Sequence, residues 1–260
     1  MHLQVLASGS GGNATLLRAG ELHLLVDAGL GPRAMRERLA AAGLAHRGLD
    51  HLLITHGHLD HARSAGALAR QHDATVHCPA AILEHRSVRR APRLVALAIG
   101  RDREVRGPSG TVVRYRPAAL PHDCDPTVAF RIEHEGRVAA VLTDLGRPCP
   151  RAARALAGAH LIVIEFNHDA ALLAEGPYPE ALKRRVASDR GHLSNEQAAV
   201  MLGALAGPEL HTVVLAHLSA RNNTPARAVA TARGALERLG LGHVRVFVAG
   251  QDEIGPNLKV

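Results

Sequence analysis

Aromatic residues are scarce in this sequence. Among 260 residues there are no tryptophans, two tyrosines and three phenylalanines, and these five are scattered along the chain. A protein that binds single-stranded nucleic acid by stacking its bases needs aromatic side chains gathered on one surface. Any contact with nucleic acid is therefore expected to be mainly with phosphates.

Cysteines and long apolar runs are also rare. Cys78, Cys124 and Cys149 are odd in number and have no Cys-x-x-Cys spacing, which argues against a disulfide framework or a thiolate zinc site. No apolar run reaches the ~18 to 20 residues that a membrane span needs. The N-terminus has no basic segment followed by a long apolar stretch, so we expect no secretory signal, no membrane association and a cytoplasmic location.

Arginine supplies almost all of the positive charge. The net charge is +7, and Lys183 and Lys259 are the only lysines. Basic charge favours anionic partners such as nucleic acid. An arginine excess can also follow from the base composition of the coding DNA. Charge alone therefore permits a nucleic-acid partner without establishing one.

The order of apolar segments predicts two mixed β-sheets covered by helices, in one domain over residues 1–260. Short apolar runs separated by Gly-rich turns begin the chain, as is typical of antiparallel strands. Helices are predicted over 32–43 and 62–72. The second half alternates helix and strand, with a polar loop over 167–194. Residues 85–110, rich in Arg and Pro, have no clear predicted structure.

Three histidines and an aspartate lie within six residues of the segment ITHGHLDHARSAG: His56, His58, Asp60 and His61. Imidazoles two residues apart on an extended loop project toward one point, and the Asp-His pair that follows can face a second point nearby. This layout suits two metal ions. Imidazole and carboxylate ligands favour zinc or manganese, with iron as a further option, over magnesium or calcium.

A two-metal site needs more ligands, and three residues at later predicted strand ends can supply them: His122, Asp144 and His217. Each residue alone would be unremarkable, because a single histidine at a strand end is usually a surface or core residue. Their common position at strand ends makes them candidates together.

The order of these seven residues resembles the metallo-β-lactamase superfamily, whose αββα sandwich carries a dinuclear site at one sheet edge. The resemblance implies that one divalent metal is held by His56, His58 and His122. It implies that a second is held by Asp60, His61 and His217, with Asp144 bridging. Asp27 matches an early aspartate that orients the ligands. The nucleophile would be a metal-bridged hydroxide, and Asp60 counts among the catalytic residues.

Further motifs narrow the resemblance within that superfamily. GHLSNEQAA at 191–199 and LAHLSARNN at 215–223 are similar to the branch that includes ribonuclease Z. LASGSGGNAT, EFNHD and YPEALKRRVASDRGHLSN resemble more closely the bacterial YycJ/WalJ-type family, regarded as double-strand DNA exonucleases. Phe166 and Ala129 depart from the residues usual in related enzymes. These departures leave the predicted ligands intact and bear on the shape of the substrate floor.

His192 is the candidate proton donor. A capping box, Ser194 to Gln197, predicts a helix that begins there, so His192 precedes its positive end. Amides at that end attract phosphate, and a histidine beside them is placed to protonate a leaving oxygen. Lower-ranking candidates for substrate contacts are Asn13, Asn167, His168, Lys183, Asn222 and Asn223.

Together these features predict a dinuclear metal-dependent phosphodiesterase, in particular a DNA exonuclease. The alternative is a hydrolase of the same fold that acts on a small cyclic nucleotide, a thioester or a lactam. The GHLSN loop and the basic charge count against the thioester and the lactam. Seven candidate ligands count against a non-catalytic metal-binding or DNA-binding protein.

Overall fold

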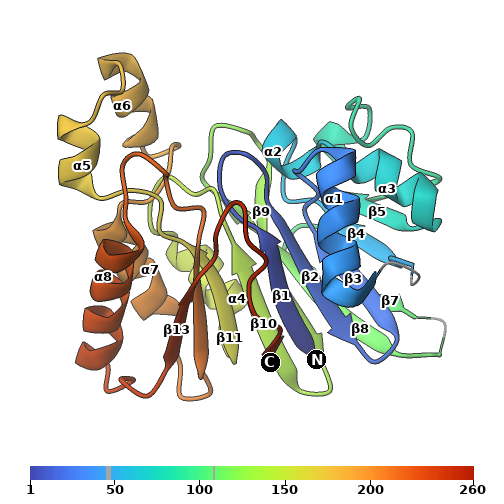
Figure 1. Ribbon diagram of the computed structural model, residues 1–260. Coiled ribbons are helices and arrows are strands. Elements are labelled where there is room, and N and C mark those ends of the chain that lie inside the picture. The colour runs from blue at the N-terminus through green and yellow to red at the C-terminus, as the bar shows by residue number, and fades with distance from the viewer. Residues whose placement is uncertain (45–47, 108) are drawn as a thin grey trace.

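Two seven-stranded β-sheets pack against each other, and helices cover their outer faces (Figure 1). The computed structural model describes residues 1–44, 48–107 and 109–260. The first sheet contains, from edge to edge, β14 (Leu258–Lys259), β1 (His2–Ala7), β2 (Ala14–Ala19), β3 (Leu22–Val26), β4 (His51–Leu53), β5 (Thr75–Cys78) and β6 (Arg93–Ala96). The second contains β13 (Arg245–Val248), β12 (Thr212–Ala216), β11 (Leu161–Glu165), β10 (Arg137–Leu142), β9 (Thr127–His134), β8 (Val112–Leu120) and β7 (Arg103–Arg106).

Both sheets are mixed. In the first, β1, β2 and β3 are antiparallel, and β3 to β6 are parallel. In the second, β7 to β10 are antiparallel, and β10 to β13 are parallel. The expected β9–β10 hairpin is present, with Glu135 and Gly136 at φ 50° and 72° in its turn.

Alternation along the strands divides their side chains between two apolar layers. In β10, Val138, Ala140 and Leu142 pack toward the helices of the second half. Ala139 and Val141 face the layer between the two sheets. A period of two is what a strand buried on both faces requires.

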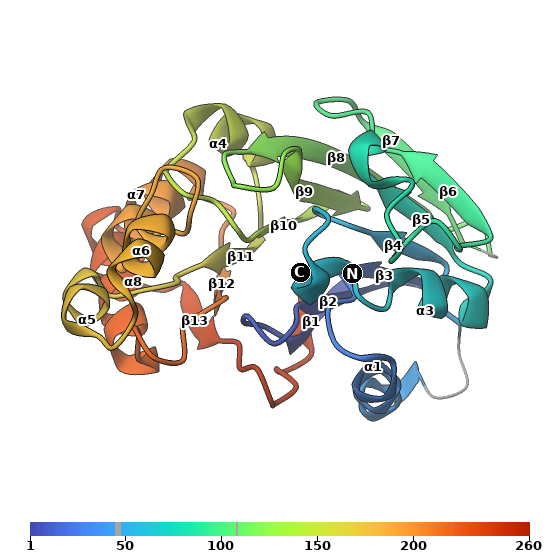
Figure 2. The same ribbon diagram turned by 90° about the horizontal axis from the view of Figure 1, so that it is seen from above.

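Helices complete the αββα order that the sequence predicts (Figure 2). The first sheet is covered by α1 (Pro32–Leu39), α2 (Leu59–Ala62) and α3 (Ala65–His72). The second is covered by α4 (Pro150–Leu156), α7 (Asn195–Leu205) and α8 (Pro225–Arg238). None of the helices in the described part of the chain is both long and apolar enough to cross a membrane.

Two local predictions need correction, and one segment without a clear predicted structure forms strands. The predicted helix over 62–72 is broken, because α2 ends at Ala62 and α3 begins at Ala65. The predicted polar loop over 167–194 contains α5 (Ala170–Glu175) and α6 (Glu180–Val186), which project beyond the sheet edge (Figure 1). Neither helix carries a wide apolar stripe, since α6 buries no residue and α5 buries only Leu173, so periodicity could not reveal them. Between 85 and 110, of which residue 108 lies outside the described residues, the chain forms β6 and β7.

Candidate metal centre

Strand ends of both sheets converge at one edge of the sandwich and carry the candidate ligands. The residues and the strands that they end or follow are Asp27 (β3), His56 (β4), His122 (β8), Asp144 (β10), Glu165 (β11) and His217 (β12). Parallel strands bring their carboxyl ends to the same sheet edge, which is where sites form in sheets of this kind. Residues far apart in the sequence thereby become neighbours.

Three of these residues have unusual backbone conformations. Asp27, Asp144 and His217 lie at φ 61°, 59° and 54°, in the left-handed region that non-glycine residues seldom adopt. Such conformations cost roughly 1–3 kcal/mol each and gather at functional sites. Here each one turns the chain sharply just after a strand.

The loop that carries Asp60 and His61 is fixed to the first strands by backbone hydrogen bonds. The carbonyl of Asp60 accepts from the N–H of Asn13 at 2.7 Å, and the carbonyl of His61 accepts from the N–H of Ala28 at 2.7 Å. A Cβ at Gly29 would lie 1.6 Å from the Asp60 oxygen, so only glycine permits this approach.

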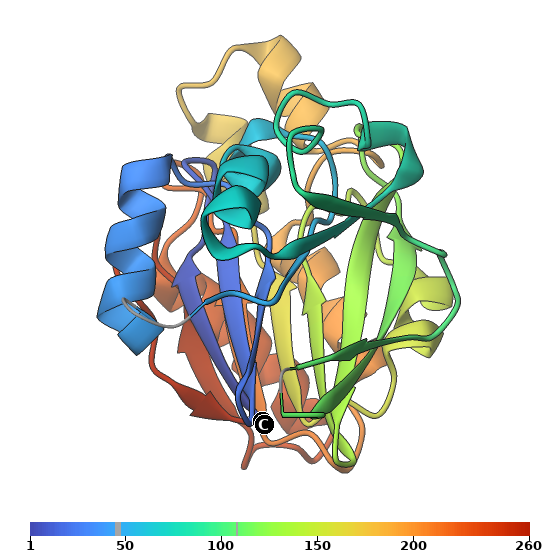
Figure 3. The same cartoon turned by 90° about the vertical axis from the view of Figure 1, so that its right-hand side faces the viewer.

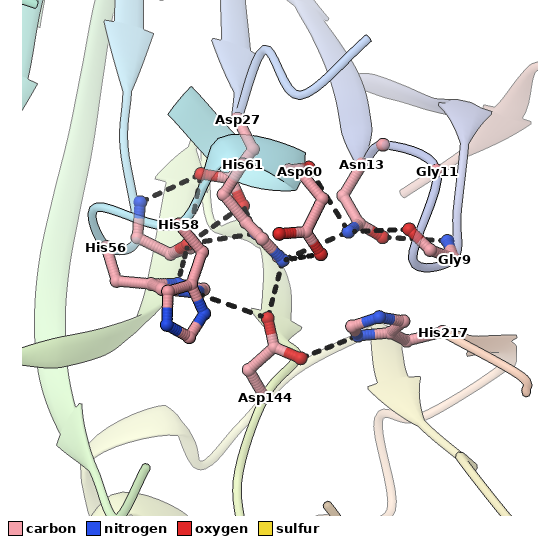
Figure 4. A network of polar contacts seen from close by, with 12 residues as sticks. Gly9, Gly11, Asn13, Asp27, His56, His58, Asp60, His61, Asp144 and His217 are labelled. Atoms are coloured by element: carbon pink, nitrogen blue, oxygen red, sulfur yellow. Dashed lines mark hydrogen bonds and ion pairs between the residues drawn. The ribbon is translucent and has the colours of Figure 1, made fainter. Parts of the chain in front are cut away.

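Potential ligand atoms form three groups, within each of which all atoms lie less than 4.8 Å apart. The groups are His56, His58 and His122; His56, His61 and Asp144; and Asp144, Glu165, His192 and His217. The first set of three predicted ligands is thus brought together. Asp144 lies between members of the second set, with Oδ2 2.5 Å from His61 Nε2 and Oδ1 2.6 Å from His217 Nδ1 (Figure 4). Oδ2 of Asp60 is 3.5 Å from His61 Nε2.

Three imidazoles are held through Nδ1, which leaves Nε2 of His56 and His122 without a partner within the described residues, while Nε2 of His61 lies 3.0 Å from Asn13 Nδ2. Nδ1 of His61 donates to Asp27 Oδ2 at 2.7 Å. Nδ1 of His122 donates to the Gly191 carbonyl at 3.0 Å. Nδ1 of His56 lies 3.0 Å from Oγ1 of Thr55, whose hydroxyl donates to Asp27. Partners of this kind fix the orientation of metal-binding histidines, the role expected of Asp27.

Several of these ligand atoms are buried and have no hydrogen-bond partner within the described residues. They are Nε2 of His56, Nε2 of His122, both carboxylate oxygens of Asp144 and Nδ1 of His217. A buried polar atom without a partner costs ~1–3 kcal/mol. Divalent cations would satisfy all of them, so the residues present fit a metal centre.

The pKa shifts of Asp144 and His56 favour the charge states that bind a cation. Burial would raise the pKa of Asp144, but His217 and His61 together hold it well below its usual value. Burial lowers the pKa of His56 well below 6.5. The Asp144 carboxylate is therefore charged and the His56 imidazole neutral at pH 7, as metal ligands require. At His61 burial lowers the pKa, but Asp144 and Asp27 outweigh it and raise the pKa well above 6.5, so a cation would displace a proton there.

Glu165, which was not selected from the sequence, is fully buried beneath Asp144 and His192. Its Oε1 accepts from the N–H of Leu193 at 2.6 Å, and its Oε2 accepts from the N–H of Asp144 at 2.7 Å. The same Oε2 lies 3.3 Å from Nδ1 of His192. The sequence signals were a carboxylate at the end of the apolar strand LIVIE and its place at the start of the motif EFNHD.

His192 has a carboxylate environment that keeps it protonated. Nδ1 of His192 is also 3.3 Å from Oδ1 of Asp144. Burial lowers the pKa of His192, but Glu165 and Asp144 outweigh it and raise the pKa to about 11. Cations bound at Asp144 would reduce this increase, because they neutralise one of the two carboxylates. The predicted capping box between Ser194 and Gln197 is present just after it.

A cavity of about 150 Å³ lies beside His192 and His217, and Asn167, Asn222 and Tyr178 help to line it. Two of the six predicted substrate contacts therefore line this cavity, although both are buried, with Asn167 Nδ2 donating to the His217 carbonyl and Asn222 Nδ2 to Ser219 Oγ.

The other four predicted contacts lie elsewhere. Asn13 is buried against Gly9 and His61, and Asn223 bonds the Phe166 carbonyl and Asn195. His168 is buried, and Lys183 bonds the Ala174 carbonyl and pairs with Glu180.

Comparison with known proteins agrees with this geometry. The sequence profile of the metallo-beta-lactamase superfamily matches residues 7–217. The chain is 32% identical over 252 residues to the exodeoxyribonuclease YycJ of Bacillus anthracis, which covers 95% of this chain and 93% of that protein. The chain belongs to the metallo-β-lactamase superfamily, and within it to the YycJ/WalJ family.

Other members of the superfamily are more distant. A ribonuclease Z from Mycobacterium is 32% identical over 178 residues, or 58% of this chain and 61% of that protein. The solved structure of the metallo-β-lactamase fold protein YhfI from Bacillus subtilis superimposes with a TM-score of 0.73 at 16% identity, over 98% of this chain and 99% of that one. Fold, family and ligand clusters together make this chain an enzyme, a metal-dependent hydrolase of the metallo-β-lactamase fold.

Proposed function

We propose that this member of the YycJ/WalJ family is an exonuclease that hydrolyses phosphodiester bonds in DNA. The observation that carries the proposal is the pair formed by the buried Glu165 and the partly exposed His192, next to the ligand clusters and the small cavity. A metal centre alone serves many hydrolases. A protonated histidine beside the metal centre can donate a proton to the leaving oxygen of the substrate. This matters most where that oxygen is a poor leaving group, as in a nucleic acid.

We assign the ligands as the superfamily resemblance implies, with the difference that the clusters around Asp144 contain Glu165 and His192 and not Asp60. His56, His58 and His122 would hold one divalent cation. Asp60, His61 and His217 would hold a second, with Asp144 between the two. Zinc, manganese or iron bound there would supply Lewis-acid activation of the phosphate and of a water molecule. Thr55 and Asp27 keep the imidazoles in the tautomer that such cations need.

His192 would deliver the proton. Its Nδ1 faces the carboxylates of Glu165 and Asp144, so Nε2 is the ring nitrogen left to donate to the leaving oxygen. Glu165 acts through His192 by orienting the ring and holding its proton. It also holds the backbone on both sides, at Asp144 and at Leu193. One buried carboxylate thus couples the proton donor to the central ligand.

The cavity beside His192 would hold the terminal unit of the substrate. The half-buried ring of Tyr178 offers an aromatic face, and Asn167 and Asn222 form part of the buried wall. Stacking one base on an aromatic side chain contributes ~1–3 kcal/mol. A cavity of about 150 Å³ takes a small group and not a length of duplex, which favours cleavage near an end.

A substrate panel tests the proposal. The metal-loaded enzyme is given end-labelled duplex DNA, single-stranded DNA, RNA of the same sequence and bis-p-nitrophenyl phosphate. We expect progressive release of mononucleotides from DNA. Hydrolysis of RNA in preference to DNA, or of the small diester with no action on either polymer, would overturn the assignment.

A further inference from the structure

A second, larger cleft opens beside the metal centre. Its volume is about 570 Å³, and it lies between α2 and α3 on one side and the chain that joins β5 to β6 on the other. Five arginines line it: Arg63, Arg70, Arg86, Arg89 and Arg90. None of the described residues that line it is acidic.

The cleft borders the chain segment that carries several of the candidate ligands. Leu59, which lines it, stands in the chain between the candidate ligands His58 and Asp60, and 39% of its surface is exposed. The N–H of Arg63 donates to the Leu59 carbonyl at 3.0 Å at the end of α2. A chain-like ligand in the cleft would therefore lie beside the segment that carries His58 and Asp60.

The two walls, which lie on the side of the molecule that faces the viewer in Figure 3, are joined by direct hydrogen bonds. The N–H of Gly66 in α3 donates to the Ser87 carbonyl at 2.7 Å, and a Cβ at Gly66 would lie 2.7 Å from that oxygen. The guanidinium of Arg70 donates to the Arg90 carbonyl at 3.2 Å. These hydrogen bonds hold the two segments that carry the arginines in place relative to each other.

The charges of these arginines are not neutralised by the protein. All five are exposed, and within residues 1–44, 48–107 and 109–260 none of them forms an ion pair. Arginines elsewhere do form such pairs, as Arg116 does with Asp102 at 2.7 Å and Arg185 with Asp123 at 2.6 Å. A planar guanidinium matches the oxygens of a phosphate in a bidentate manner.

We propose that this arginine cleft, defined by Arg63, Arg70, Arg86, Arg89 and Arg90, binds the sugar–phosphate backbone of the DNA strand that enters the metal centre. The proposal rests on the proposed function. It extends that function by placing the uncleaved strand on the α3 side and the terminal unit in the cavity at His192. A membrane surface would call for apolar anchors, and Leu59 is the one large apolar side chain exposed among the described residues of the cleft.

The test compares two triple variants of the metal-loaded enzyme. One is Arg63→Gln, Arg86→Gln and Arg89→Gln in the cleft. Its matched control is Arg36→Gln, Arg154→Gln and Arg233→Gln on α1, α4 and α8, where the arginines are exposed and form no ion pair within the described residues. Both triples lower the net charge by three, so a difference between them reports position and not total charge.

Affinity for fluorescent duplex DNA with hydrolysis-resistant phosphorothioate linkages is measured by anisotropy over a salt series. Each lost phosphate contact reduces the slope of log affinity against log salt by about 0.9. For the cleft variant we expect the slope of log affinity against log salt to be smaller in magnitude by about 2 to 3 and the affinity to be at least ~10-fold weaker. The control variant should stay close to wild type in both. Equal losses in the two variants would overturn the proposal.

Two further readouts separate the possible failures. If the wild-type enzyme neither binds nor cleaves DNA, the proposed function itself is wrong. If it cleaves DNA while the two variants behave alike, only the arginine cleft is wrong. Melting temperature and metal content are compared in all proteins. Because Arg63 follows two candidate ligands closely, the double variant Arg86→Gln and Arg89→Gln repeats the test away from α2.

Discussion

Oδ1 of Asp144 lies 2.6 Å from Nδ1 of His217, and neither atom makes a hydrogen bond within the described residues. Both residues have left-handed backbone conformations, Asp144 after β10 and His217 after β12, the strands on either side of β11. Two buried polar atoms held this close without a hydrogen bond are arranged to share a cation. Asp144 is therefore the residue on which the metal centre depends most.

Replacement of Asp144 by asparagine should release metal and abolish turnover. The substitution keeps the shape of the side chain but removes the charge that faces His61 and His217. We expect a loss of at least ~100-fold in DNA hydrolysis, together with reduced metal content by elemental analysis. Asp102→Asn, at an exposed aspartate paired with Arg116, is the control and should retain both. Two metals bound to Asp144→Asn would show that Asp144 does not bridge them.

Replacement of His192 by alanine should slow the cleavage of DNA and leave the metals in place. General acid catalysis contributes typically 10²- to 10⁴-fold, and DNA should show a loss in that range. Bis-p-nitrophenyl phosphate has a good leaving group and should show a small loss. Similar losses on both substrates would make His192 a contact residue. Loss of metal would make it a ligand, in keeping with its place in the cluster with Asp144 and Glu165.

Glu165→Gln should move the pH dependence of DNA cleavage. The Glu165 carboxylate raises the pKa of His192, and the acid form of His192 is present only below that pKa. Removing the charge lowers the pKa, so the decline in rate at alkaline pH should begin at a lower pH in the variant. The measurement is kcat against pH for both enzymes. A profile that falls uniformly without moving would assign Glu165 a structural role alone.

The buried side chain of His77 should make the free energy of unfolding decrease at acidic pH. This buried histidine bonds Tyr115 and His51, and burial lowers its pKa to about 3. Between pH 6.5 and pH 3 the His77 side chain binds a proton in the unfolded chain but not in the folded chain. The free energy of unfolding therefore decreases as the pH falls. From pH 7.5 to pH 5 this contributes about 2 kcal/mol. Urea unfolding at both pH values should show a smaller change in His77→Gln, and an equal change would refute the assignment.

The candidate ligands could be predicted because their chemistry is concentrated in the sequence. HGHLDH places four donors in six residues, and His122, Asp144 and His217 each follow an apolar strand. Once strands of a sheet are parallel, their ends meet at one edge, so this geometry follows from the element order. The αββα fold could be predicted for the same reason, since β10, β11 and β12 are apolar on both faces.

What could not be predicted depends on contacts between distant segments. Asn13 and Asn223 belong to motifs of the family, yet both are taken up by hydrogen bonds inside the scaffold. The role of Glu165 depends on hydrogen bonds from the backbone N–H groups of Asp144 and Leu193. No local sequence pattern connects those two residues to Glu165. The arginine cleft joins two segments of the chain, including one in which the sequence indicated no structure.

Reconstitution of the metal-stripped enzyme tests the central claim most directly. Zinc or manganese is added in stoichiometric steps, and the release of mononucleotides from end-labelled duplex DNA is measured at each step. The account predicts that activity is absent without metal and reaches its full value near two equivalents per chain. Full activity at one equivalent, or no DNA cleavage at any stoichiometry, would contradict it.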